Sequence, residues 1–280
     1  MSETALSVVA TSVKSPAGTS GKRRLSRFLL GLALPIGLLL LLEAASHLGL
    51  TPPHLLPAPS AVFETLIELG RSGLGTHIFA SSLRVLLGFA IGAGLGLAVA
   101  ISVGLSRRLE EILDPSFQAL RAVPSLAWVP LLLLWLGIDE TPKIVLIAIG
   151  AFFPVYLNVV SGLRNVDRKL VELGETYGLT SWGLARRILL PAALPSIFTG
   201  LRTSLSLAWM FLVAAELIAA TKGLGYLLTD GRETSRPDIV IAAILLLAVL
   251  GKLSDGLLKN IEERALRWRD SFDERLERKA

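Results

Sequence analysis

The chain contains no cysteine, so neither a disulfide framework nor a thiolate metal site is available. Histidine is scarce as well: His47, His54 and His77 stand far apart near segment ends, and a metal cluster would have to be assembled from distant loops. Charged residues make up only 18% of the 280 residues. No metal and no other cofactor is expected, and a globular domain with a polar surface is disfavoured.

Apolar residues are abundant instead. They form 52% of the chain, and the mean hydropathy is +0.62, which favours a membrane protein. Long apolar runs predict an all-α, polytopic membrane bundle of about six helices. The predicted spans are Phe28–Leu48, Leu83–Gly104, Val123–Gly137, Ile144–Gly162, Ile197–Ala220 and Ile239–Gly256.

The segment before the first span, residues 1–27, is rich in Ser and Thr and ends in a basic cluster, which predicts a disordered cytosolic tail. Residues 28–50 then form the first span. A cleaved signal peptide is an alternative, because Ala44, Ala45 and Ser46 resemble a cleavage site. The long polar leader and Glu43 argue against cleavage.

The next segment, residues 51–76, is predicted to be periplasmic. It contains four prolines and then an amphipathic run from Ser60 to Leu69. With Ser60 as the N-cap, this run predicts a short interfacial helix.

Proline and glycine mark two of the spans. Pro124 and Pro130 interrupt the third, and prolines at membrane depth are tolerated where neighbouring helices or a water-filled cavity satisfy the freed carbonyls. We therefore expect the third span to lie inside the bundle.

Gly88 and Gly92 in the second span have the spacing of a close helix–helix contact, for which simple packing is the favoured role.

The net charge of +5 raises the possibility of a nucleic-acid surface, but the basic residues gather in short loops between apolar spans, where they set membrane orientation. With the N-terminus inside, the outside segments keep only five basic residues, while Arg84 and Arg202 lie at span edges. This distribution predicts a multi-pass inner-membrane protein with both termini in the cytosol. No nucleic-acid partner is expected. The five outside residues are Arg71, Lys143, Lys222, Arg232 and Arg236.

The longest cytosolic loop, residues 166–195, has helical periodicity of its own. Leu170, Leu173, Tyr177 and Leu184 can share an apolar stripe, with a break at Gly178. The pattern predicts two helices along the membrane face, joined by a glycine turn. An exposed apolar surface of this kind needs a partner, although packing on its own bundle is the alternative.

The spacing in this loop resembles the EAA loop of ABC-importer permeases, Glu-Ala-Ala-x3-Gly-x9-Ile-x-Leu-Pro. Leu173 and Gly174 replace the two alanines, and Gly174 is expected to weaken the helix by roughly 1 kcal/mol. By this resemblance, the loop is a coupling helix that seats in a cleft of an ATP-binding subunit. The residues implied are Glu172, Leu173, Gly174, Tyr177, Gly178, Ile188, Leu190 and Pro191, with Gly178 forming the turn and Pro191 ending the loop.

The likeness covers residues 56–269, including Arg121-Ala-Val-Pro-Ser-Leu-Ala-Trp-Val-Pro130 and Ala214-Ala-Glu216. These stretches resemble the aliphatic-sulfonate permeases of bacteria, with taurine, nitrate and pyrimidine-precursor permeases as close relatives. The resemblance implies a MetI-like, type I ABC-importer transmembrane domain over residues 77–258 and a cytosolic tail over 259–280.

That resemblance also implies partners. These are membrane lipid, a second permease copy, two copies of an ATP-binding subunit, and a periplasmic or lipid-anchored binding protein that delivers the solute. ATP-driven closure of the ATPase pair would move the coupling helices together and rock the spans between inward-open and outward-open states.

Candidate contacts along the path of an anionic solute are Arg121, Ser125, Asn158, Ser161 and Glu216. For Arg121, a cytosolic anchoring role is favoured over a substrate contact. A carboxylate late in the fifth span is costly unless paired, and nearby Lys222 is the partner that the sequence offers Glu216. We favour a structural role for Glu216, with gating as the alternative.

The sequence contains no Gly-x4-Gly-Lys-[Ser/Thr] phosphate loop, so ATP hydrolysis is assigned to a separate subunit. It contains no Gly-x-Ser-x-Gly elbow either, so nothing in it suggests an esterase. A secondary transporter driven by an ion gradient would use acidic residues inside its spans to couple the ion. This alternative is remote, because Glu216 is the only evident acid well inside a span. A membrane scaffold is another, although a scaffold has no need for the spacing between Glu172 and Pro191.

Overall fold

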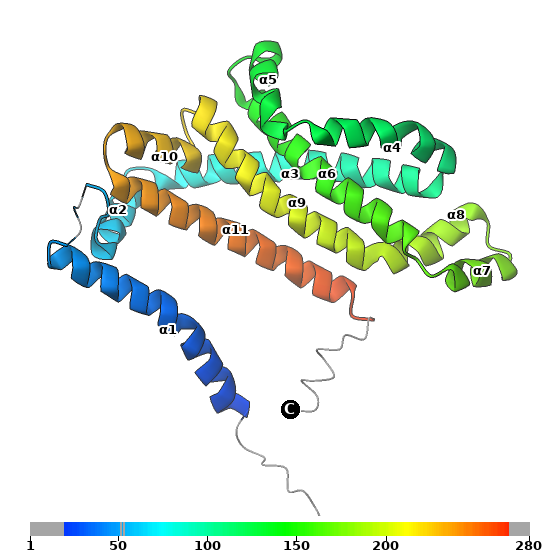
Figure 1. The fold of residues 1–280 in the computed structure, drawn as a ribbon, viewed down its shortest axis with the longest axis horizontal. Coiled ribbons are helices and arrows are strands. Elements are labelled where there is room, and N and C mark those ends of the chain that lie inside the picture. The colour runs from blue at the N-terminus through cyan, green and yellow to red at the C-terminus, as the bar shows by residue number, and fades with distance from the viewer. Residues whose placement is uncertain (1–19, 51, 53, 269–280) are drawn as a thin grey trace, which may run out of the picture.

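The computed structural model describes residues 20–50, 52 and 54–268, and Figure 1 shows them as a helical bundle. The described residues contain no β-strand. The helices are α1 Ser20–His47, α2 Pro59–Arg71, α3 Leu74–Leu105, α4 Arg107–Ala122, the 3-10 turn Ser125–Trp128, α5 Val129–Leu136, α6 Glu140–Arg164, α7 Arg168–Thr176, α8 Ser181–Leu184, the π-helical turn Ala185–Leu189, α9 Leu190–Ala219, α10 Leu224–Glu233 and α11 Pro237–Ala265.

Four helices are long and apolar enough to cross a membrane: α3, α6, α11, and α9 together with the turns that precede it. The bent pair of α4 and α5 adds a fifth candidate, and the described apolar part of α1, Ala33–His47, is shorter. The all-α membrane bundle predicted from the sequence is therefore confirmed. The helices extend past the apolar runs; α3 begins nine residues before the predicted Leu83.

The core of the bundle lies where α3, α6 and α9 meet. Side chains such as Val155, Val159 and Leu212 are fully buried there. Glycines bring the backbones close: a Cβ atom on Gly92 would lie 2.2 Å from the carbonyl oxygen of Ala148, and Gly88 and Gly96 face α6 in the same way. The packing role predicted for Gly88 and Gly92 is confirmed.

The third predicted span is not a single buried helix. After α4, the chain bends by 86° at Pro124 and continues through the 3-10 turn into α5. In Figure 1, α5 projects from the top of the bundle. Only Leu132 of α5 is buried, while Leu134 and Trp135 are exposed, so the prediction that this segment lies inside the bundle is wrong for the single chain.

The start of the chain departs from the prediction in two places. Helix α1 begins at Ser20, so residues 20–27 are helical rather than disordered, whereas residues 1–19 lie outside the described part. Helix α2 begins at Pro59 with Ala58 as the N-cap, because proline is favoured in the first helical turn. Ser60 is therefore not the N-cap; its amide and hydroxyl donate hydrogen bonds to Glu43 at 3.0 and 2.7 Å.

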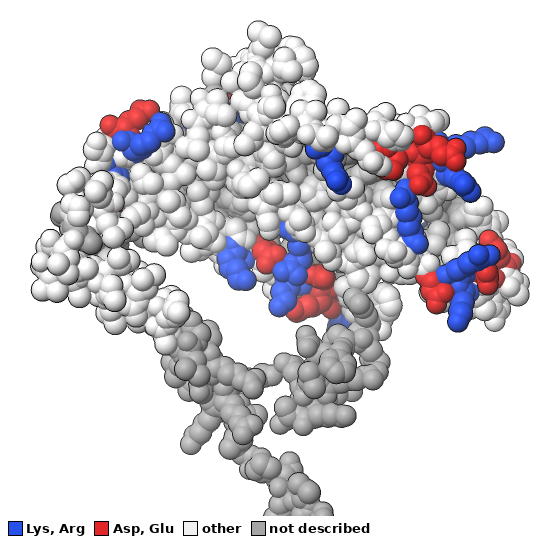
Figure 2. Space-filling model, viewed as in Figure 1, with Lys and Arg blue, Asp and Glu red and all other residues white. Residues whose placement is uncertain are grey.

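The C-terminal helix also runs beyond its apolar segment. Helix α11 continues to Ala265, so the first seven residues of the predicted tail 259–280 are helical, and residues 269–280 lie outside the described part. On the face shown in Figure 2, charged side chains gather in a few separate patches, and the surface between these patches is uncharged. That distribution fits a protein with a broad lipid-covered belt.

Candidate functional site

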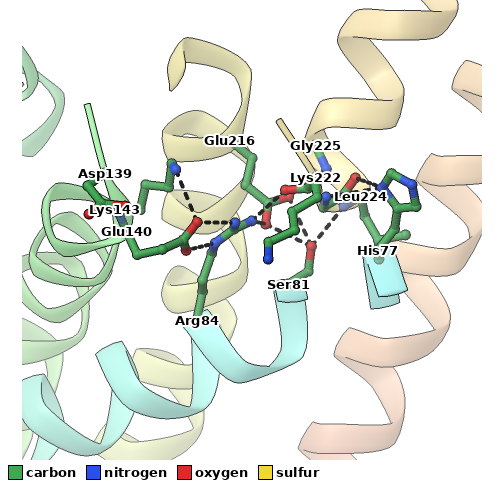
Figure 3. Close-up of polar contacts among 11 residues, drawn as sticks. His77, Ser81, Arg84, Asp139, Glu140, Lys143, Glu216, Lys222, Leu224 and Gly225 are labelled. Atoms are coloured by element: carbon green, nitrogen blue, oxygen red, sulfur yellow. Dashed lines mark hydrogen bonds and ion pairs between the residues drawn. The ribbon is translucent and has the colours of Figure 1, made fainter. Parts of the chain in front are cut away.

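A group of charged residues, buried apart from the half-exposed Glu140, ties α3 to α6 and α9 at the end of the bundle where α10 lies. We call it the Glu216 cluster and define it as Ser81, Arg84, Glu140, Lys143 and Glu216 (Figure 3). Arg84 and Glu216 are 2% and 1% exposed. Since an unpaired charge at such a place would be very costly, the cluster has to be internally balanced.

Arg84 is the centre of the cluster, because all three of its guanidinium nitrogens donate. Nη1 lies 2.5 Å from Glu216 Oε1 and 2.7 Å from the carbonyl oxygen of Lys222. Nε and Nη2 lie 2.5 and 2.7 Å from the two carboxylate oxygens of Glu140, a bidentate pair. Lys143 Nζ approaches the same carboxylate at 3.4 Å.

Glu216 accepts bonds from neutral donors as well. The Ser81 hydroxyl lies 2.8 and 2.9 Å from its two oxygens, and the amide of Gly225 donates to Oε2 at 2.7 Å. A Cβ atom on Gly223 would lie 2.4 Å from Glu216 Oε1, and this residue has φ +130°. The chain between α9 and α10 therefore folds directly over the carboxylate because position 223 has no side chain.

Sequence reasoning predicted that Glu216 would be structural and paired, but named the wrong partner. The side chain of Lys222 makes no ion pair with a described residue, and only its backbone carbonyl joins the cluster. Arg84, 132 positions earlier in the chain, is the partner. The signal that the sequence offered was the position of Arg84 within an apolar stretch. This signal was missed because the helix was expected to begin at Leu83, which places Arg84 at the edge of the span.

The second candidate site is the loop between α6 and α9. Helix α7 is capped by Asp167, whose carboxylate accepts from the amide of Lys169, and it ends in a turn in which Gly178 has φ +71°. The predicted helix and glycine turn are thus present. Helix α8 then runs through the π-helical turn into α9 without a break, so Pro191 lies at the start of α9 and does not end the loop, and the second arm is no separate helix.

One face of this helical hairpin is apolar and exposed. Leu170, Leu173, Tyr177 and Trp182 are 44%, 53%, 79% and 67% exposed. Leu184 does not share this stripe as predicted; its Cδ1, like that of Ile188, would lie 2.6 Å from a Cβ atom on Gly174. Gly174 thus allows the two arms to approach closely. The sequence predicted only that this glycine weakens the helix, and not this packing role.

The remaining loop residues frame this surface. Glu172 accepts from Arg168 Nε at 2.8 Å on the exposed side of α7. Leu190 and Pro191 are half-buried at the start of α9, where the loop joins the bundle.

The proposed path residues are not gathered in one place. Arg121 is exposed and Ser125 half-buried at the α4–α5 bend. On α6, Asn158 donates to the carbonyl of Pro154, and exposed Ser161 accepts from Asn165. Asn158 packs against Gly200, which is 16 residues before Glu216 on α9, or about 24 Å at 1.5 Å per residue.

The fold and the two sites define a helical membrane protein with a buried ionic clasp and an exposed apolar hairpin. Residues 90–267 match the family described as "Binding-protein-dependent transport system inner membrane component". The chain belongs to this family. It is a permease subunit of an ABC transporter, an inner-membrane component rather than an enzyme, and such permeases work with ATP-binding subunits and solute-binding proteins.

Among curated relatives, a Bacillus subtilis protein named as the aliphatic sulfonates transport permease SsuC is 42% identical over 272 residues, which cover 97% of this chain and 98% of the relative. Its Escherichia coli namesake is 44% identical over 240 residues, covering 85% and 91%. Among solved structures, an inward-facing form of the MetNI methionine ABC transporter aligns with a TM-score of 0.61 at 19% identity, covering 69% of this chain and 95% of that chain. The structural likeness supports the type I importer fold.

Proposed function

We propose that this permease forms the translocation path for aliphatic sulfonates and that residues 166–195 are its coupling loop for the ATPase. The observation that carries the coupling assignment is the exposed apolar face of the α7–α8 hairpin, formed by Leu173, Tyr177 and Trp182. Such a surface on a loop is costly in water and favours a protein partner. The family membership and the EAA-like spacing make that partner the ATP-binding subunit.

The sulfonate assignment is supported by the two relatives named for aliphatic sulfonates, which match this chain over most of its length. Taurine, nitrate and pyrimidine-precursor uptake are the alternatives that the sequence resemblance offers. Selection among these anions is expected to rest largely with the solute-binding protein.

For the assembly, we propose two permease copies, two ATP-binding subunits and one binding protein. The cytosolic side is assigned to the α7–α8 loop and to both termini, on the basis of the arginine and lysine distribution. Residues 77–258 form the type I transmembrane domain in this proposal, α1 precedes it, and the Glu216 cluster is then on the periplasmic side.

Growth tests the substrate class. A strain that lacks this gene is complemented by the wild-type gene and supplied with alkanesulfonates or taurine as sole sulfur source, or with nitrate as sole nitrogen source. We expect complementation to restore growth on alkanesulfonates. Rescue restricted to nitrate would contradict the sulfonate assignment, and rescue restricted to taurine would narrow it to that one compound.

A further inference from the structure

A cavity of about 530 Å³ opens beside the Glu216 cluster, between α3 and the N-terminal end of α6. One part of its lining is apolar and the other part is ionic. The apolar lining includes Phe79, Leu83 and Ile144, and the ionic part consists of Arg84, Glu140 and Lys222.

The ionic part carries one positive charge in excess. Within the cluster, Glu140 and Glu216 balance Arg84 and Lys143. Arg84 is largely occupied, because each of its three nitrogens already donates to a carboxylate. Lys222 is the cation that remains: no described carboxylate lies within 4.0 Å of its Nζ.

Lys222 is also held in place. Its carbonyl oxygen accepts from Arg84 Nη1 at 2.7 Å, which fixes the backbone at the rim of the cavity. Figure 3 shows its side chain extending alongside the cluster, with no dashed line to its nitrogen. An exposed ammonium group on a flexible side chain is therefore attached to a fixed point at the rim, within reach of the apolar wall.

We propose that this cavity is a binding subsite for an amphipathic anion, with the negative head at Lys222 Nζ and the apolar tail against Phe79, Leu83 and Ile144. A short alkanesulfonate has this chemistry, so the identity of the ligand rests on the proposed function. The subsite lies on the side assigned to the periplasm, where a delivered solute would arrive. The phosphate head of an anionic lipid offers the same charge, and the experiment separates the two sources.

The absence of cysteine provides a direct test. Leu83→Cys gives each permease copy one thiol, in its cavity wall, and no other thiol remains once the ATP-binding subunit is made cysteine-free. Its modification rate is measured in nanodiscs with two methanethiosulfonate reagents of similar size, one carrying an ethylsulfonate group and the other an ethyltrimethylammonium group. Each reagent forms a mixed disulfide with the thiolate and releases methanesulfinate.

We expect Lys222→Gln to lower the rate ratio of anionic to cationic reagent by about fivefold or more, because a single charge at close range is removed. Lys222→Arg should retain the ratio. Thr234→Cys, on the exposed end of α10 outside this cavity, is the matched control, and its ratio should not respond to Lys222→Gln. An unchanged ratio at Leu83→Cys would overturn the subsite.

Protection identifies the occupant. Pentanesulfonate should slow the modification of Leu83→Cys by the neutral reagent methyl methanethiosulfonate, whereas pentyltrimethylammonium should not, and Lys222→Gln should abolish the protection. If protection depends instead on phosphatidylglycerol in the nanodisc and not on pentanesulfonate, the assignment to a solute is overturned.

The two proposals fail separately. If the wild-type gene failed to restore growth on alkanesulfonates while the ratio of anionic to cationic labelling still depended on Lys222, the proposed substrate would be wrong and an anion subsite would remain. If the wild-type gene restored growth on alkanesulfonates but Lys222→Gln had no effect on labelling at Leu83→Cys, the subsite would be refuted and the transport assignment would remain.

Discussion

The stability of the α10 end of the bundle depends on a few buried residues. Arg84 joins two carboxylates from different helices, and Glu216 collects bonds from Arg84, Ser81 and the amide of Gly225. Removing one partner of a buried ion pair leaves the other charge uncompensated, and this typically costs about 3–5 kcal/mol.

Arg84→Gln and Glu216→Gln are therefore each expected to lower the thermal unfolding temperature of the detergent-solubilised complex markedly. Arg107→Gln is the control, since its pair with Glu111 is 90% and 68% exposed and contributes about 0–1 kcal/mol. Because both cluster variants disturb the same network, the double variant should be far less destabilised than the sum of the two. Additive losses would contradict the pairing.

At this scale the sequence was informative about chemistry but not about contacts. A carboxylate inside an apolar run must be paired, so a partner for Glu216 was predictable. Its identity was not, because proximity in sequence favours Lys222, whereas the helix packing brings in Arg84 from 132 positions away. The role of Gly174 was hidden for the same reason: it is defined by Leu184 and Ile188 on the other arm.

Among the helices, the ones with long apolar runs were predictable, and their ends were not. Polar residues continue the hydrogen-bonded helix beyond the apolar segment, as at both ends of α11. The α4–α5 bend was only partly foreseen: Pro124 and Pro130 indicated an interruption, but not its 86° angle. Helix α10 was missed because it is short and of mixed polarity.

The α7–α8 turn offers a test of coupling. Gly178 has φ +71°, which costs other residues roughly 1–2 kcal/mol, and its surroundings are open. Gly178→Arg should leave the protein in the membrane but disconnect it from its ATPase, because it distorts the turn beside exposed Tyr177. The readouts are ATP-dependent uptake in proteoliposomes and co-purification of the ATPase.

Gly178→Asn is the matched control, since asparagine tolerates the left-handed region and carries no charge. It should retain most of the uptake. Normal ATP-dependent transport by Gly178→Arg would refute the coupling assignment for this loop.

For the whole molecule, the proposed orientation in the membrane rests on the placement of arginine and lysine. Single cysteines at Ser72, which follows α2, and at Lys259, near the end of α11, probe the two sides. In intact spheroplasts, a membrane-impermeant maleimide should label Ser72→Cys and leave Lys259→Cys unlabelled until the membrane is permeabilised. The reverse result would invert the proposed topology.

Close backbone contacts give α3, α6 and α9 a collective property. Besides the glycines of α3, Gly150 and Gly162 on α6 lie against Phe211 and Ser196 of α9, so none of the three helices has room to slide past another. The hairpin formed by α7 and α8 is attached at both ends to this block, to α6 on one side and α9 on the other. A force applied to the hairpin would therefore not separate those two helices. It would rotate the block as one piece, and deformation would be confined to helices that the block holds less tightly, such as α5.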